Sequence, residues 1–200
     1  MKLHVFPRSP NARKVMMAAQ EAGVPVELEI VDLHKGEQRR SEFLALNPNG
    51  KMPVLEYDDG TSLWESNAIT NQLAELGGGK LFPGGRDRFQ IGQWQFWEMA
   101  HWAPEISKFI RATFFDVPLD RETEAPALQK VASVLNGQLA GRDWLVSNQM
   151  TTADISVAAM LCYREVCDLP LGDVPNIDRW MERISQLESW KEVTREPEPA

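Results

Sequence analysis

The chain has 200 residues with 43% hydrophobic and 25% charged residues, which is ordinary for a globular protein of one large domain or two small ones. Its formal net charge of −8 argues against a general nucleic-acid-binding protein, because phosphate neutralisation needs a basic face. No apolar run approaches the roughly 18 residues of a membrane span, and the N-terminus lacks the long apolar region of a signal peptide, so we expect a cytoplasmic protein with no membrane partner.

The first part of the chain alternates strand and helix patterns. Leu3–Phe6 is a short strand candidate. Ser9 followed by Pro10 is typical of a helix N-cap and first helical position, and the apolar spacing predicts a helix that runs to Ala22. Val26–Ile30 alternates apolar with acidic residues, which predicts a half-buried strand.

A hairpin and a helix follow, and they begin at a proline. Pro53 has no N–H and keeps Met52 extended, which leaves the amide and carbonyl of Met52 free for an outside partner. A helix capped by Ser66 or Asn67 should follow the hairpin, and a helix N-terminus is a good anion site. The predicted elements are a helical turn, two strands joined by an Asp-Asp-Gly turn, and a helix: Ser41–Leu46, Val54–Tyr57, Ser62–Trp64 and a helix to Leu76.

Beyond residue 86 no convincing strand is present and apolar residues recur at helical spacing. We therefore predict an α/β thioredoxin-like domain over residues 1–79, a linker over 80–85 and an all-helical domain over 86–200. Thr151 and Asp154 have the spacing of a capping box. The predicted helices cover about 87–109 with a kink at Pro104, 122–139, a helix from Thr151, and a last long helix from Pro175 to about 187, followed by a frayed tail over 196–200.

Neither the cysteines nor the histidines form a metal-site pattern. Cys162 and Cys167 are five residues apart, which fits neither redox CxxC spacing nor a zinc site, so we expect them to pack in the core. The three histidines are scattered along the chain. We expect no metal cofactor.

Two separated motifs occur here in an order that resembles a known family. The pairs Met52-Pro53 and Glu65-Ser66 resemble the glutathione-binding half of the cytosolic glutathione S-transferases, and the Thr151–Asp154 box and the Pro-Asn-Ile-x-x-Trp opening at Pro175 resemble their helical domain. The resemblance covers nearly the whole chain and is to bacterial, serine-type members, similar to the phi, theta and beta classes or to the nu class with its Ser-x-Asn pair. It implies the glutathione S-transferase fold, glutathione as co-substrate and a homodimer.

The resemblance implies a hydroxyl or amide donor that stabilises the glutathione thiolate. The thiolate is the nucleophile, and a free thiol is mostly protonated at neutral pH. Ser9 lies after the first strand at the start of the first helix, where that donor should be, and Asn11 is the second candidate. The alternatives are that Ser9 is only a helix cap and Asn11 only a solvated residue of the first turn.

The resemblance also implies the residues that bind the rest of glutathione. The backbone of Met52, next to Pro53, would pair with the cysteinyl part, and Glu65 and Ser66 would hold the γ-glutamyl end. Donors to the glycine carboxylate would be Gln38, Arg39 and Lys51, whose alternative is a solvated loop.

Four residues of the first long helix in the second domain, most of them aromatic, are candidates for the electrophile pocket: Trp97, His101, Trp102 and Ile106. An aromatic stripe at helical spacing is equally consistent with a core.

The leading function is glutathione conjugation to a hydrophobic electrophile. The alternatives are glutathione-dependent peroxide or disulfide reduction, and a non-catalytic binding or regulatory protein on the same fold.

Overall fold

The computed structural model describes residues 1–195, so the expected frayed tail at 196–200 lies outside the described residues. The chain divides into two compact units. The first, called the sheet unit here, contains Met1–Gly84 together with the described residues from Glu188 onward. The second, the helical unit, contains Gly85–Leu187.

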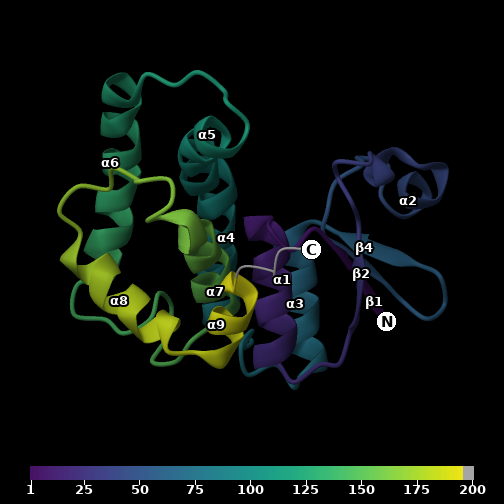
Figure 1. Ribbon diagram of the computed structural model, residues 1–200. Coiled ribbons are helices and arrows are strands. Elements are labelled where there is room, and N and C mark those ends of the chain that lie inside the picture. The colour runs from purple at the N-terminus through teal and green to yellow at the C-terminus, as the bar shows by residue number, and fades with distance from the viewer. Residues whose placement is uncertain (196–200) are drawn as a thin grey trace. The chain divides into compact units, whose positions relative to one another are not determined.

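The sheet unit has four short strands and the helices that accompany them (Figure 1). The chain order of strand, helix and strand, then hairpin and helix, is the thioredoxin-like order predicted from the sequence. Its elements are β1 (Lys2–Val5), α1 (Pro10–Glu21), β2 (Glu27–Ile30), η1 (Glu37–Arg39), α2 (Ser41–Leu46), β3 (Val54–Glu56), β4 (Ser62–Trp64) and α3 (Ser66–Leu76).

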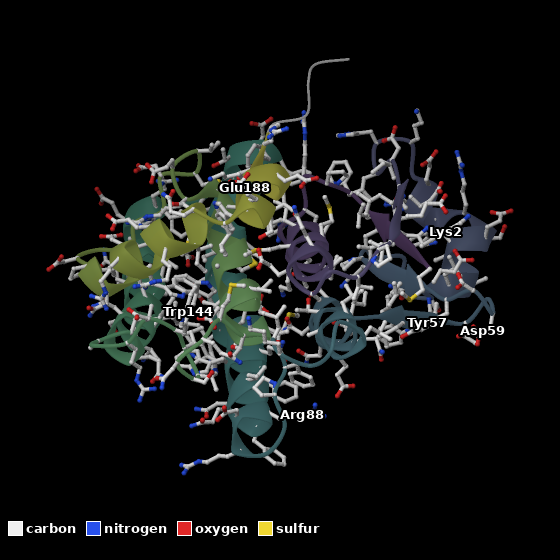
Figure 2. The ribbon with its side chains drawn as sticks, turned by 90° about the horizontal axis from the view of Figure 1, so that it is seen from below. Lys2, Tyr57, Asp59, Arg88, Trp144 and Glu188 are labelled. Atoms are coloured by element: carbon white, nitrogen blue, oxygen red, sulfur yellow. The ribbon has the colours of Figure 1, made fainter. Side chains whose placement is uncertain are left out.

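The sheet has the strand order β2-β1-β3-β4. β1 and β2 are parallel, as a strand-helix-strand crossover requires, and the other two pairs are antiparallel. The β3–β4 hairpin turns through residues 57–61, where the Thr61 N–H and hydroxyl donate to Asp59 Oδ1; Tyr57 and Asp59 are labelled in Figure 2. The hairpin leads directly into α3, so it places the start of that helix at one end of the sheet.

Helices α1 and α3 lie side by side in the sheet unit (Figure 1). Their C-terminal ends meet at Gly77, where a Cβ atom would lie 2.2 Å from the backbone oxygen of Ala22. Only glycine allows this approach. The buried residues of α1 include Ala12, Val15 and Ala19. The starts of these two packed helices carry the candidate binding residues.

The prediction of a half-buried β2 strand is wrong. All four residues of β2 are exposed, with Leu28 at 45% and Ile30 at 52%. The strand lies at the edge of the sheet and pairs only with β1. Alternation of apolar and acidic residues reports which side chains share a face, but it does not say whether another element covers that face.

The helical unit contains no strand within its residues, in agreement with the predicted all-helical domain. The predicted helix over 87–109 is divided by a π-helical segment just before Pro104, which occupies the first turn of the next helix. The elements of this unit are α4 (Arg86–Trp97), η2 (Glu98–Trp102), α5 (Ala103–Phe114), α6 (Arg121–Gln138), α7 (Thr152–Ala159), η3 (Met160–Tyr163) and α8 (Pro175–Ser185).

The predicted capping box is present at the start of α7. The Asp154 carboxylate accepts from the Thr151 N–H at 2.9 Å and from the Thr151 hydroxyl at 3.0 Å through Oδ2. Its Oδ1 accepts from the Leu145 N–H at 2.9 Å and from Trp180 Nε1 at 3.1 Å. Burial raises the pKa of this carboxyl, and these hydrogen bonds oppose the rise. Asp154 therefore joins three segments of the helical unit.

A final short helix, α9 (Glu188–Thr194), belongs to the sheet unit. Trp190 and Val193 are buried, the Ser189 hydroxyl donates to Glu21, and Gln20 Nε2 donates to Glu192 at 2.8 Å. The sequence pattern groups these residues with the helical domain because they follow helices, whereas their contacts join them to α1. Among the described helices none is long and apolar enough to cross a membrane.

Candidate active site

The turn from β1 into α1 presents the Ser9 hydroxyl. The Ser9 N–H donates to the Phe6 oxygen at 2.8 Å, its carbonyl accepts from the Arg13 N–H at 2.9 Å, and Pro10 occupies the first turn of α1. Ser9 is thus the N-cap by position, as predicted. Its side chain makes no capping bond, however, and within residues 1–195 no other hydrogen bond of that hydroxyl is present. The backbone is held while the hydroxyl stays available to a ligand.

The loop before β3 presents the backbone of Met52. The Met52–Pro53 peptide is cis. Within the described chain, neither the N–H nor the carbonyl of Met52 makes a hydrogen bond. The loop itself is fixed by Asn47, which is 2% exposed: its Nδ2 donates to the Lys51 oxygen at 2.7 Å, and its Oδ1 accepts from the Asn49 N–H at 3.0 Å. A fixed loop therefore offers one donor and one acceptor to an extended partner.

The candidates for the glycine end of a bound peptide come from two loops that touch. At Gly50 a Cβ atom would lie 3.2 Å from the Gln38 backbone oxygen, so η1 and the loop before Met52 are in close contact. The Gln38 Oε1 atom is buried and has no hydrogen-bond partner within residues 1–195. Arg39 and Lys51 are exposed. The structure therefore brings Gln38 next to the loop that ends at Lys51. The exposed cations Arg39 and Lys51 directly follow Gln38 and Gly50 in the sequence.

Glu65 and Ser66 form the start of α3. Glu65 is the exposed N-cap and has a positive φ of 74°, a backbone region that non-glycine residues rarely adopt. Its carbonyl still accepts the first helical bond, from the Ile69 N–H at 3.0 Å. Ser66 is 5% exposed, and its carbonyl accepts from the Thr70 hydroxyl at 2.8 Å. The Glu65 side chain is therefore accessible to solvent at the N-terminus of α3, which carries a partial positive charge.

Two of the predicted site residues, Ser66 and Asn11, are hydrogen-bonded to each other, and Ser66 also contacts Lys14, which the sequence analysis missed. Ser66 Oγ donates to Asn11 Oδ1 at 3.3 Å and accepts from Lys14 Nζ at 3.1 Å. The starts of α1 and α3 are therefore connected through side chains. Because the Asn11 Oδ1 atom faces Ser66, the donating Nδ2 atom of that amide faces away from Ser66.

The four candidates in the helical unit differ in accessibility. Trp102 and Ile106 are 0% exposed, and Trp102 Nε1 donates to the Val157 oxygen at 3.1 Å. Trp97 stacks on Trp102 with ring centroids 5.7 Å apart and is partly exposed, whereas His101 is exposed. Trp102 and Ile106 thus take the core-packing alternative, and only Trp97 and His101 have surface for a ligand.

Comparison with known proteins decides the family. Residues 8–76 match the family profile of the glutathione S-transferase N-terminal domain, and residues 103–188 match that of the C-terminal domain. A crystal structure of glutathione S-transferase from Pseudomonas fluorescens is 36% identical and covers 94% of this chain and 96% of its own, with a TM-score of 0.82. The chain belongs to the glutathione S-transferase family. The predicted fold and enzyme class are therefore confirmed.

Two further relatives of this transferase have different activities in their names, one an oxidoreductase and the other a transferase. The disulfide-bond oxidoreductase YfcG of Escherichia coli is 31% identical over 188 residues, which is 90% of this chain and 87% of the relative. A glutathione transferase from Burkholderia graminis, solved with two glutathione molecules bound per subunit, is 26% identical and covers 100% of this chain and 89% of its own, with a TM-score of 0.86. The similarity extends over both units in each case.

Two residues of the transferase site escaped the sequence analysis. Asn47 precedes Pro-Asn-Gly, and the side chain of an Asn before a turn commonly accepts from the backbone N–H two residues later. The role of Asn47 could therefore have been predicted from the sequence. Lys14 gave no such signal, because a lysine on a helix is usually solvated. Only the three-dimensional packing shows that it is buried against Ser66.

Proposed function

We propose that this transferase binds glutathione in the sheet unit and ionises its thiol with the hydroxyl of Ser9. The observation that carries the proposal is the Ser9 hydroxyl, which lies at the N-terminus of α1 and is not used to cap that helix. A hydroxyl that donates to sulfur stabilises the thiolate, and the partial positive charge of the helix start acts in the same direction. This proposal includes the serine-type assignment and the bacterial origin expected from the sequence.

The remaining contacts of the proposed complex follow from groups that the fold leaves available. The Met52 N–H and carbonyl would pair with the cysteinyl backbone. Glu65 would hold the γ-glutamyl amine, and Ser66 with the start of α3 would hold its carboxylate. The glycine carboxylate would lie near Gln38, Arg39 and Lys51. The Burkholderia relative solved with glutathione supports the same ligand for this chain.

In the reaction, the bound thiolate attacks an electrophilic carbon. The carbon–sulfur bond forms as the bond to the leaving group breaks, and the leaving group departs with its electron pair. The proton lost from the thiol goes to solvent before the attack. Trp97 and His101 are the candidates to contact the electrophile, since they keep accessible surface, and an aromatic face suits a hydrophobic substrate.

Disulfide reduction is a second candidate, which the similarity to YfcG favours. The same thiolate would attack a disulfide, form a glutathione mixed disulfide and release one thiolate; a second glutathione thiolate would then release the other and leave oxidised glutathione. Cys162 and Cys167, the only cysteines of the chain, lie in the helical unit, so no protein cysteine at the start of α1 would take part. Glutathione itself would supply both electrons.

The experiment is a paired assay after retention on immobilised glutathione. Turnover of a chlorodinitrobenzene measures conjugation, and reduction of hydroxyethyl disulfide, coupled to glutathione reductase, measures the second reaction. We expect both activities to require Ser9, because both need the thiolate. Retention on the column without turnover of either substrate would contradict the proposal and favour a non-catalytic binding protein.

A further inference from the structure

Lys14 is a lysine whose whole side chain is inside the protein. It is 0% exposed and lies in the second turn of α1. An ammonium is costly to remove from water, so a buried one is usually retained for a structural or functional reason. Its Nζ atom donates to Ser66 Oγ at 3.1 Å, which places it directly behind the proposed γ-glutamyl site.

The direction of the hydrogen bonds around Ser66 is set by Lys14. An ammonium can only donate, so Ser66 Oγ is the acceptor in that bond. The single hydroxyl hydrogen of Ser66 must then point elsewhere, and it is directed to Asn11 Oδ1 at 3.3 Å. That bond is longer than the usual O–H···O separation of about 2.7–2.8 Å. A carboxylate is a much stronger acceptor than an amide carbonyl and would draw this hydrogen away from Asn11.

We propose that Lys14 is a positioning residue that makes the glutathione site selective for the γ-glutamyl carboxylate; this inference rests on the proposed function. Lys14 keeps Ser66 in the donor orientation. A carboxylate oxygen that accepts from Ser66 Oγ at about 2.7 Å lies within about 6 Å of Lys14 Nζ, a range in which an opposite charge favours the ionised group. The buried ammonium therefore adds to the positive end of α3, and a ligand without the carboxylate gains nothing from it.

The test compares two ligands by calorimetry. S-Methylglutathione carries the γ-glutamyl carboxylate and cannot react through its sulfur. Its analogue with a 4-aminobutanoyl group in place of the γ-glutamyl group lacks only that carboxylate. Lys14→Met removes the ammonium and keeps an unbranched apolar side chain out to the Cε position. We expect Lys14→Met to weaken S-methylglutathione binding about 10–100-fold, and to change the affinity for the analogue by less than about 3-fold.

Two further variants separate positioning from simple packing. Thr70→Val is the matched control, because Thr70 is also 0% exposed and its hydroxyl donates to the carbonyl of Ser66 rather than to the Ser66 hydroxyl. It should affect both ligands equally. Lys14→Arg retains the positive charge, and we expect it to recover part of the preference for the carboxylate ligand that Lys14→Met loses.

The outcomes distinguish this inference from the function on which it rests. Equal losses for the two ligands in Lys14→Met, with tight binding by the unaltered protein, would overturn the role of Lys14 and leave the proposed function standing. Failure of the unaltered protein to bind S-methylglutathione would overturn both.

A measurement on the unaltered protein avoids dependence on the folding of Lys14→Met. In protein labelled with ¹³C at the lysine Cε carbons, the Lys14 resonance, assigned by its loss in Lys14→Arg, should shift with S-methylglutathione and stay in place with the decarboxylated analogue. Identical shifts with the two ligands would contradict the proposal.

Discussion

Replacement of Asp154 tests how much one buried carboxylate stabilises the helical unit. Each of its two oxygens accepts two hydrogen bonds, from Thr151, Leu145 and Trp180. Three of these donors are N–H groups that cannot turn away, while the Thr151 hydroxyl can rotate. Asp154 and Thr151 are both 0% exposed, so water does not replace the lost acceptor.

The expected cost follows from these donors. An unsatisfied buried donor costs about 1–3 kcal/mol, and neighbouring losses are not fully additive, so Asp154→Ala should lower the free energy of unfolding by about 3–5 kcal/mol. Asp154→Asn should cost less, about 1–3 kcal/mol, because its remaining oxygen can serve Leu145 and Trp180 while its NH₂ group faces the Thr151 N–H and a hydroxyl that can rotate to accept.

Urea unfolding followed by tryptophan fluorescence measures both values. The matched control is Asp120→Ala, which removes an exposed cap at the start of α6, where Asp120 Oδ1 accepts from the Thr123 N–H at 3.2 Å. That change should cost only about 1 kcal/mol. If Asp154→Ala and Asp120→Ala proved equally destabilising, the reasoning from buried donors would be refuted.

Three further predictions concern the glutathione site and the assembly. Ser66→Ala should weaken glutathione binding by about 1–3 kcal/mol in calorimetry, through loss of a charge-assisted hydrogen bond; an unchanged affinity would remove Ser66 from the site. Glu65→Gly should relieve the positive φ of 74° and raise the unfolding free energy by about 1 kcal/mol while glutathione affinity falls, and a variant that bound glutathione normally would contradict the role of Glu65. Phe89 and Phe96, seven residues apart on α4 and 82% and 78% exposed, support the predicted homodimer, so light scattering should give twice the 22.6 kDa of one chain rather than that mass itself.

The sequence predicted elements whose signals are local. The Thr151–Asp154 capping box needs only two residue types at a fixed spacing, and Ser9 before Pro10 likewise identified the start of α1. Pro53 before Val54 indicated that the backbone of Met52 would lack hydrogen-bond partners. Within residues 1–195 neither the N–H nor the carbonyl of Met52 makes a hydrogen bond. Each of these inferences depends on the chain's own covalent geometry and nearest neighbours.

Features that depend on packing between elements far apart in the sequence were not predictable in this way. The exposure of β2 follows from its place at the sheet edge, and α9 joins the sheet unit because Ser189 and Glu192 meet residues of α1 about 170 positions earlier. Lys14 reads as a solvated helical residue until α3 is seen beside it. In the same way, a helical stripe could not separate the buried Trp102 from the accessible His101.

The most direct test of the account is a pH titration of the glutathione complex, followed by the ultraviolet absorbance of the thiolate. We predict that Ser9→Ala raises the pKa of the bound thiol and lowers turnover by about 10–100-fold, equivalent to about 1.4–2.7 kcal/mol, while glutathione affinity barely changes. Asn11→Ala is measured in parallel, because the Asn11 amide is the other candidate donor. If Ser9→Ala left both the thiol pKa and the rate intact while Asn11→Ala shifted them, Asn11 would be the donor and the central claim about Ser9 would be contradicted.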